Sequence, residues 1–264
     1  MLQNIKRILL AILTCYIIIG SLWICQIYIR HQLHRKGLPI LGYHSVVPNP
    51  EKNALYPNDP YVLSASDFEK QMQYLYVNQY HTLTLDQVYE YYMGTSTLHT
   101  PSIVLTFDDG YLNFNTIVKP ILEKYNFHAS AFVIGKKVHQ KNTKYLHKKD
   151  LIPDKTVSYY SHSYDLHHFS SVPYHKMLEV ASMQEIENDI TKSSQIVDTS
   201  YYAYPYGIST KVAKKALKNK QIKLAFGFNE NRHMTRQDDQ YALPRYLIFG
   251  NMPMWYFKWI VEQG

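Results

Sequence analysis

Two adjacent acids follow one of the most apolar segments of the chain. Ser102–Phe107 (SIVLTF) predicts a buried strand, and Asp108, Asp109 and Gly110 come directly after it. In α/β barrels the carboxyl ends of the strands carry the active site. Because successive side chains of an extended segment point to opposite sides, the two carboxylates are suited to different roles. A turn or a helix cap without any catalytic role would also explain Asp-Asp-Gly.

Histidines are concentrated after another predicted strand, Val157–Tyr160. His162, His167 and His168 lie within seven residues, and imidazole nitrogens are common metal ligands. His162 and His167 are five residues apart, a spacing that fits neither one helix face nor one strand face. They therefore converge only if the segment forms a loop. An exposed histidine-rich loop is the alternative, since the chain has 13 histidines.

Three further polar or aromatic groups lie at predicted strand ends. His44 follows Gly42-Tyr43, Pro205 and Tyr206 follow Tyr201–Tyr204, and Arg245 precedes Tyr246–Phe249. Each has a structural explanation when taken alone: a structural histidine, an aromatic turn and a surface charge. A barrel, however, would gather all of these strand ends around one mouth.

The elements expected to position these residues alternate between strands and helices. Further strands are expected at Pro39–Tyr43, Ala129–Ile134 and Leu224–Phe228. Helices are expected at Ile117–Tyr125, Met183–Ile196 and Thr210–Asn219. Another helix is expected behind an N-cap at Ser66, where Phe68, Met72 and Leu75 lie at helical spacing. Lys136–Lys155 is basic and aperiodic, which indicates a surface excursion. The alternation favours a mostly parallel α/β sheet or barrel.

The amino-acid composition excludes several classes of protein. The chain has 264 residues, of which 46% are hydrophobic, so a disordered chain is excluded. Its two cysteines, Cys15 and Cys25, cannot form a disulfide framework for the rest of the chain. Residues 1–36 carry five of the seven formal net positive charges and no acid. The remainder is only weakly basic, so nucleic acid is not an expected partner.

The N-terminal segment predicts a membrane anchor. Ile8–Ile29 contains no charged residue and is long enough to cross a bilayer as a helix. The expected organisation is an anchor with basic flanks over 1–36 and one domain over 37–264. A buried core helix is the alternative. The flanking charges do not decide the orientation, because Lys6 and Arg7 on one side face Arg30, Arg35 and Lys36 on the other.

Five motifs together resemble those of the polysaccharide deacetylases, the NodB-homology carbohydrate esterases of family 4. TFDDG (106–110) is similar to the first motif of the family, and the histidine pair to the second, with four residues between the histidines where the family commonly has three. This wider spacing, AYPYG (203–207), GYH (42–44) and LPRYLI (243–248) resemble the subgroup that deacetylates poly-β-1,6-N-acetylglucosamine. Ala203 replaces the third-motif arginine of the wider family.

The resemblance implies a distorted (β/α)₇ barrel and a set of site residues. Asp109, His162 and His167 would hold a divalent metal ion, with zinc expected, while Asp108 acts as base and His44 as acid. Tyr206, next to Pro205, would stabilise the oxyanion through its backbone N–H. Arg245 is a candidate to orient Asp108 in place of the missing arginine.

The resemblance also implies a substrate and a location. The expected reaction is removal of N-acetyl groups from poly-β-1,6-N-acetyl-D-glucosamine, a biofilm exopolysaccharide, by an enzyme held outside the cell membrane beside the exopolysaccharide synthesis machinery. The 25 tyrosines suit stacking on sugar rings. A peptidoglycan or chitooligosaccharide deacetylase is the first alternative, against which the wide histidine spacing and the early His44 count. An inactive glycan-binding module is the second.

Overall fold

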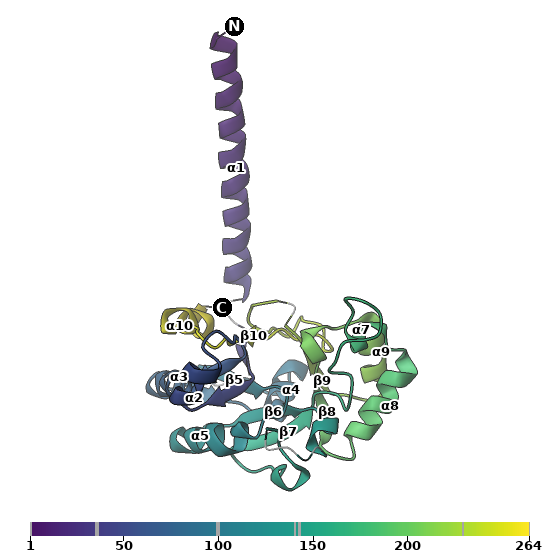
Figure 1. The fold of residues 1–264 in the computed structure, drawn as a ribbon. Helices are drawn as coiled ribbons and strands as arrows, with labels where there is room; N and C mark the ends of the chain where they lie inside the picture. Colours follow the sequence, from purple (N-terminus) through teal and green to yellow (C-terminus); the bar gives the residue numbers. More distant parts are fainter. Residues whose placement is uncertain are drawn as a thin grey trace.

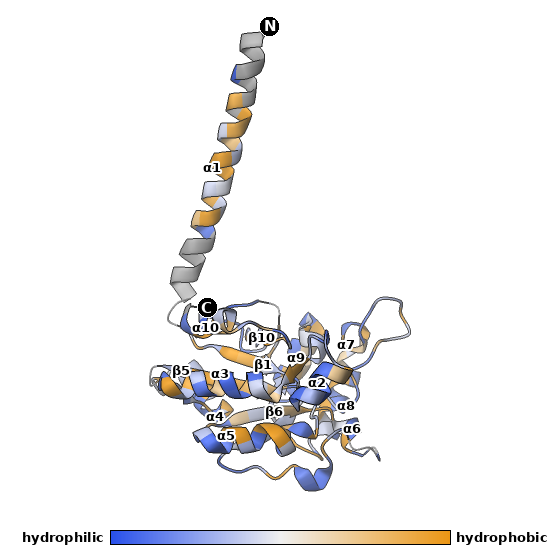
Figure 2. Cartoon of the chain, turned by 60° about the vertical axis from the view of Figure 1, so that its left-hand side comes forward, coloured by the Kyte–Doolittle hydropathy of each residue, from blue (hydrophilic) through white to orange (hydrophobic). Residues whose placement is uncertain are grey.

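The computed structural model describes residues 2–34, 37–98, 101–139, 141, 144–228 and 230–263; the side chains of 2–6, 8, 9, 11, 27–34 and 263 lie outside that description. Helix α1 (Leu2–His34) extends away from the rest of the chain (Figure 1). Leu13, Ile17 and Trp23 are more than half exposed, and Figure 2 shows hydrophobic positions along the described part of the helix.

The predicted membrane anchor is not supported by this helix. Across the part of the chain that the structure describes, no helix combines the length and the apolar character needed to cross a membrane. The ends of the predicted span Ile8–Ile29 and its flank at residues 35–36 fall on positions outside the described residues or side chains.

One parallel sheet organises the remaining chain. Its strand order is β10 (Tyr246–Leu247), β1 (Ile40–Tyr43), β5 (Ser102–Phe107), β6 (Ala129–Val133), β7 (Val157–Ser161), β8 (Asp198–Ala203) and β9 (Leu224–Phe226), with β4 (His81–Thr82) paired to β5. The ends of the row approach each other at a parallel bridge between Phe226 and Leu243. The predicted parallel α/β sheet is therefore present, and an irregular bridge joins its two ends.

Helices and short connections surround this sheet. They are α2 (Asn49–Leu55), α3 (Ala65–Val77), α4 (Leu85–Met93), α5 (Lys119–Tyr125), α6 (Gly135–Val138), α7 (Met177–Val180), α8 (Met183–Ser193), α9 (Lys211–Asn219) and α10 (Met254–Gln263), with the strand pair β2 (Ser45–Val47) and β3 (Val62–Ser64). In Figure 1, helices α3 and α5 lie to the left of the sheet and α8 and α9 to its right. Phe68, Met72 and Leu75 of α3 are fully buried in the main core with Leu105 of β5.

Sequence patterns located the strands better than the helix boundaries. The strand predicted at Ser102–Phe107 is confirmed, and the other predicted strands lie within a few residues of those observed. The N-cap prediction was wrong: Ser64 caps α3, because its side chain accepts a hydrogen bond from the Asp67 N–H, and Ser66 lies inside the helix. The helix predicted at Ile117–Tyr125 starts as a π-helical turn at Phe114–Val118.

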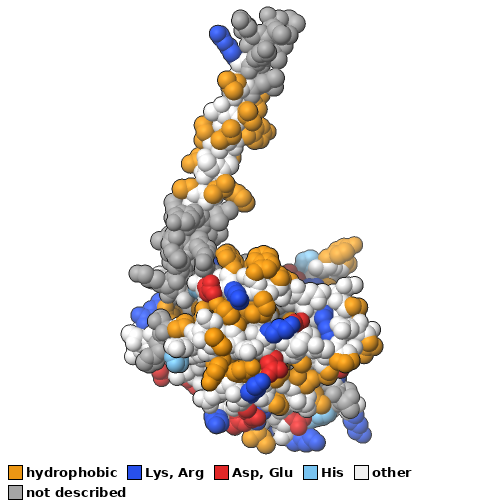
Figure 3. Space-filling model, turned by 90° about the vertical axis from the view of Figure 1, so that its left-hand side faces the viewer, with side chains coloured by type: hydrophobic (Ala, Val, Ile, Leu, Met, Phe, Trp, Pro, Cys, Tyr) orange, Lys and Arg blue, Asp and Glu red, His pale blue; other side chains and the backbone are white. Residues whose placement is uncertain are grey.

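The outer surface over α3 and α5 mixes charges of both signs. Figure 3 shows this side, on which lysine and arginine side chains lie among aspartate and glutamate. The ion pairs Lys70–Asp67 and Lys124–Glu69 join residues of these helices. This face therefore presents a mixed charge pattern, in keeping with the weakly basic composition of the domain.

Candidate active site

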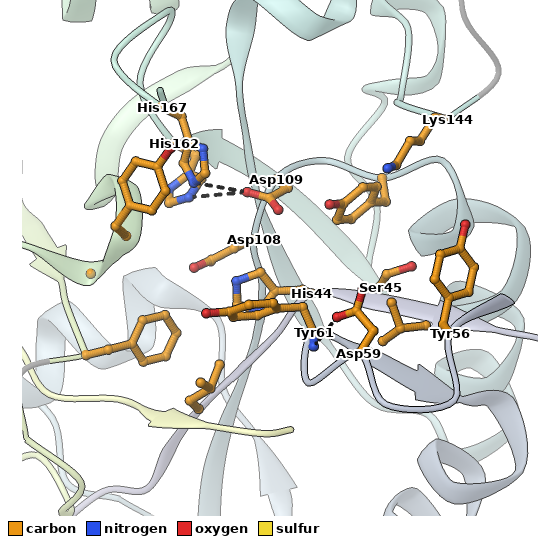
Figure 4. A pocket seen from close by; sticks show the side chains of 16 residues that line it. His44, Ser45, Tyr56, Asp59, Tyr61, Asp108, Asp109, Lys144, His162 and His167 are labelled. Atoms are coloured by element: carbon orange, nitrogen blue, oxygen red, sulfur yellow. Dashed lines mark hydrogen bonds and ion pairs between the residues drawn. The ribbon is translucent and has the colours of Figure 1, made fainter. Parts of the chain in front are cut away.

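The carboxyl ends of five strands surround one pocket of about 370 Å³ (Figure 4). Its lining includes His44 after β1, Asp108 and Asp109 after β5, His162 and His167 after β7, Tyr206 after β8 and Phe228 after β9. Of the remaining residues predicted from the sequence, Pro205 immediately precedes Tyr206, and Arg245 contacts Asp108. Parallel strands thus bring together residues that are more than 180 positions apart in the chain.

Asp109, His162 and His167 form a cluster suited to a metal ion. Asp109 Oδ1 lies 3.6 Å from His162 Nε2 and 3.4 Å from His167 Nε2. The three candidate ligand atoms all lie within 4.8 Å of one another. Asp109 Oδ1 is buried and accepts no hydrogen bond from the described residues. A buried carboxylate oxygen without a donor, facing two imidazole nitrogens, fits the donor set of a divalent cation.

The surroundings of the two histidines favour neutral imidazoles that can bind a metal ion. His162 Nδ1 lies 2.8 Å from the Ala203 carbonyl oxygen, so Nδ1–H donates there and the Nε2 lone pair faces Asp109. Burial, followed by the nearby His162, lowers the pKa of His167 to about 4, although Asp109 acts in the opposite direction. Both features favour metal binding near neutral pH, because a protonated imidazole cannot coordinate a metal.

Asp108 is held by a buried arginine. Arg245 Nη1 donates to Asp108 Oδ1 and Nη2 to Oδ2, each at 2.8 Å, and both side chains are almost fully buried. Nη1 also donates to Thr106 Oγ1 at 3.0 Å. Burial alone would raise the pKa of Asp108, yet the Arg245 charge and hydrogen bonds, with His162, hold it well below its usual value. The carboxylate is therefore ionised and fixed in orientation.

His44 lies on the opposite side of Asp108 from the metal cluster (Figure 4). Its ring centroid is 4.9 Å from that of Tyr61 and 6.2 Å from that of Phe228. Burial lowers the pKa of His44, while Asp108 and Asp109 act to raise it. Its Nδ1 atom is buried and has no hydrogen-bond partner among the described residues. The imidazole therefore lies between aromatic walls, close to the carboxylates of the pocket.

Unusual backbone conformations accompany the site. Asp109, Ser163 and Tyr206 all have a positive φ, at 72°, 67° and 58°. Residues other than glycine rarely adopt this conformation, and such strain is concentrated at functional sites. Here the three residues follow β5, β7 and β8, where the chain turns sharply to bring side chains to the pocket.

Asp189 on α8 fixes the loop between the two histidine ligands. Its carboxylate accepts the backbone N–H groups of Tyr164 at 2.7 Å and Asp165 at 2.8 Å. The side chain comes from an amphipathic helix and was not identified from the sequence. A charged residue on the buried face of a predicted helix was the signal that could have revealed it.

Other pocket residues were also missed. Tyr56, Asp59 and Tyr61 come from the connection between α2 and β3 (Figure 4), and Tyr111 and Lys144 also line the pocket. Lys144 belongs to Lys136–Lys155, whose described residues lie mostly at the surface, as predicted, while Lys144 also lines the pocket. The segment approaches the site because Tyr145 stacks on Tyr111 with ring centroids 5.1 Å apart. Neither the connection between α2 and β3 nor the segment that carries Lys144 shows a hydrophobic periodicity. Their positions at the pocket depend on contacts with residues far away in the sequence.

The chain is similar in sequence to known polysaccharide deacetylases. The model of the polysaccharide deacetylase family matches residues 95–225. The poly-β-1,6-N-acetyl-D-glucosamine N-deacetylase of Staphylococcus aureus strain N315 is 28% identical over 203 residues, which are 71% of this chain and 68% of that protein. The Staphylococcus epidermidis protein of the same name is 27% identical over the same shares.

Solved structures show the same fold. The Streptococcus pyogenes deacetylase PplD, in complex with acetate, has a TM-score of 0.70 at 24% identity, covering 82% of this chain and 94% of that one. IcaB from Ammonifex degensii has a TM-score of 0.68 at 23% identity, covering 86% and 97%. The family match contains the Asp109, His162 and His167 cluster, whereas His44 and Arg245 lie outside it.

Proposed function

We propose that this chain, which the polysaccharide deacetylase family model matches over residues 95–225, hydrolyses the N-acetyl groups of poly-β-1,6-N-acetyl-D-glucosamine. The observation that carries the proposal is the pocket in which the Asp-His-His cluster lies beside the arginine-held Asp108 and His44. The substrate follows from the staphylococcal relatives, which are named for this polymer. The reaction is hydrolysis of an amide, releasing acetate and leaving a free amine on the sugar.

In this proposal Asp109, His162 and His167 hold a divalent cation, with zinc favoured by two imidazoles and one carboxylate. The bound ion would lower the pKa of water and polarise the acetamide carbonyl group. Metal dependence is itself part of the proposal. It is supported by the unpaired Asp109 oxygen and by the low pKa of His167, because together they leave three donor atoms free for a cation.

Asp108 accepts the proton of the attacking water. The carboxylate stays ionised near neutral pH, because the Arg245 charge and hydrogen bonds, with His162, hold its pKa low against the opposing effect of burial. Arg245 also fixes both carboxylate oxygens, which determines the direction from which a proton is accepted. Arg245 therefore supplies the orientation that the third-motif arginine would otherwise give.

His44 donates a proton to the leaving amine, because an amide anion is a very poor leaving group. The aromatic rings of Tyr61 and Phe228 hold the imidazole in place. Negative charge on the acetamide oxygen is stabilised in part by the backbone N–H of Tyr206, whose left-handed conformation turns the Pro205–Gly207 segment at the pocket wall.

One assay tests the function. Acetate release by the full chain is measured on β-1,6-linked and β-1,4-linked N-acetylglucosamine oligomers of equal length, with and without a chelator. We expect release from the β-1,6 oligomers alone, loss on chelation and recovery when zinc is added. Faster release from β-1,4 oligomers would favour the chitooligosaccharide alternative. Binding of the β-1,6 oligomers without acetate release would favour an inactive glycan-binding module.

We further propose that the domain over residues 37–264 acts outside the cell. The support is the substrate, because a biofilm polysaccharide is found at the cell exterior. Digestion of intact cells by added protease tests the location: the domain should be degraded while a cytoplasmic marker survives. Protection equal to that of the marker would contradict an exterior location.

A further inference from the structure

An exposed edge of the pocket carries two aromatic rings and a lysine. The Tyr206 ring stacks on His167 with centroids 4.3 Å apart, and the Phe169 ring lies 5.9 Å from Tyr206. Lys176 Nζ lies 3.5 Å from the Phe169 centroid and 4.6 Å from the Tyr206 centroid. We call Phe169, Lys176 and Tyr206 the lysine edge. It adjoins the candidate metal cluster directly through the His167 contact.

The backbone holds this edge in a fixed arrangement. Phe169 and Lys176 form an antiparallel bridge, and Met177 N–H donates to the His168 carbonyl at 2.9 Å. Glu179 accepts the Lys176 backbone N–H at 2.7 Å at the start of α7, and Leu178 of that helix is buried. The lysine is therefore anchored through its main chain, while its ammonium group is directed over the two rings.

The lysine edge combines one positive charge with an exposed aromatic ring. Within the described ranges no carboxylate forms an ion pair with Lys176, and Phe169 is 62% exposed. An ammonium group can only donate hydrogen bonds. An apolar ring with one exposed side is suited to the C–H face of a pyranose. The edge thus offers a stacking surface and a positive donor, next to the position where an acetamide group would be hydrolysed.

A polymer substrate presents two kinds of neighbouring unit to this edge. An N-acetylglucosamine unit has a neutral acetamide whose carbonyl oxygen accepts a hydrogen bond. A glucosamine unit, the product of the reaction, has an ammonium group that only donates and repels a lysine. Like charges that meet at an exposed site lower binding by roughly several-fold. The group that Lys176 would contact is therefore a neutral hydrogen-bond acceptor in one unit and a positive donor in the other.

We propose that the lysine edge binds the sugar unit next to the one being hydrolysed and selects a unit that still carries its acetyl group. The proposal rests on the proposed deacetylase function and adds a prediction of where along the polymer the acetyl groups are removed. Sites beside an already deacetylated unit react slowly, so the free amines along the polymer are spaced apart. Lys176 is then a specificity-determining residue, and Phe169 supplies the stacking surface.

The test uses two pentamers of β-1,6-linked units, one fully acetylated and one with a single glucosamine unit beside the reporting unit. For each enzyme the ratio of kcat/KM on the two pentamers is measured at pH 6. The variants are Lys176→Met, which keeps the length of the side chain, and Lys176→Glu, which reverses the charge. Lys215→Met on the exposed face of α9 is the matched control for net charge.

We expect the natural enzyme and Lys215→Met to prefer the fully acetylated pentamer by about 3–10-fold. The preference should vanish in Lys176→Met and reverse in Lys176→Glu. An unchanged ratio in both Lys176 variants would overturn the proposal while leaving the deacetylase function intact, since both pentamers would still release acetate. Failure of every enzyme to release acetate from the fully acetylated pentamer would instead count against the function itself.

Phe169→Ala should raise KM on both pentamers without changing the ratio of their kcat/KM values. An altered ratio would assign the selection to Phe169.

Discussion

Arg245 and Asp108 form a bidentate ion pair in the interior of the sheet, with both oxygens paired at 2.8 Å. The two residues are 137 positions apart and meet because β10 pairs with β1, which in turn pairs with β5. The guanidinium also lies 4.2 Å from the Phe228 centroid, so an aromatic ring of the pocket covers it. The orientation of the candidate base therefore depends on the last strand of the sheet.

Removing one partner of this pair should be costly. Arg245→Met leaves a buried carboxylate without its cation, and we expect the free energy of unfolding to fall by about 3–5 kcal/mol in urea titrations. The double variant Arg245→Met with Asp108→Asn should recover part of that loss, because the uncompensated charge is gone. Additive losses in the double variant would show that the two residues are not energetically coupled.

The two adjacent acids should differ in metal content. Asp109→Ala removes a candidate ligand and should lose bound metal by elemental analysis, whereas Asp108→Asn keeps an acceptor for Arg245 and should retain the metal while losing activity. His168→Ala is a matched control, because His168 is exposed and lies outside the cluster. Metal loss in Asp108→Asn with retention in Asp109→Ala would reverse the proposed roles.

His44 should matter for turnover and not for metal binding. His44→Ala is expected to lower kcat by about 10²–10⁴-fold, the usual contribution of a positioned acid or base, with metal content unchanged. His139→Ala, at an exposed position after α6, provides the comparison. Near-normal acetate release by His44→Ala would assign proton donation to another group.

Asp189 should make stability depend on pH in mildly acidic solution. Burial raises the pKa of Asp189 to about 6 from an ordinary value of 3.8, although the N–H groups of Tyr164 and Asp165 oppose the change. Between about pH 4 and 6 the folded protein holds a proton that the unfolded chain has lost. The contribution of Asp189 to the free energy of unfolding is therefore complete below about pH 4, and it is lost as the pH rises through about 6.

The variant Asp189→Asn cannot titrate and isolates this effect. The free energy of unfolding of the metal-free natural protein should fall by up to about 3 kcal/mol more than that of the variant between pH 4 and 7. Parallel curves for the two proteins would mean that Asp189 titrates normally. Weaker metal binding by the variant at pH 7 would add evidence that Asp189 holds the loop between the histidines.

Strand ends could be predicted from the sequence because apolar runs stop where polar residues begin. Ser102–Phe107 followed by Asp108 is the clearest case, and the contact of Arg245 with Asp108 was anticipated as a candidate from the missing arginine. The helix cap was misplaced because Ser64 and Ser66 are equally suitable residues, and only the backbone decides between them.

The walls of the pocket could not be predicted, because long-range contacts place them. The connection carrying Tyr56 and Asp59 is fixed by Lys52, whose buried ammonium donates to their carbonyl oxygens at 2.6 and 3.2 Å. A lysine in a short helix gives no sequence signal for such a role. Lys144 reaches the pocket in a comparable way, through the stacking of Tyr145 on Tyr111.

The pairing of β10 with β1 has a consequence for how the enzyme matures during synthesis. Asp109, His162 and His167 belong to the middle of the chain, so a growing polypeptide contains all three candidate ligands well before Arg245 is made. Domains fold as units as the ribosome releases them. A chain that ends before Arg245 still lacks the cation that balances Asp108. On the proposed mechanism, hydrolysis therefore begins only when the final strand docks beside the first.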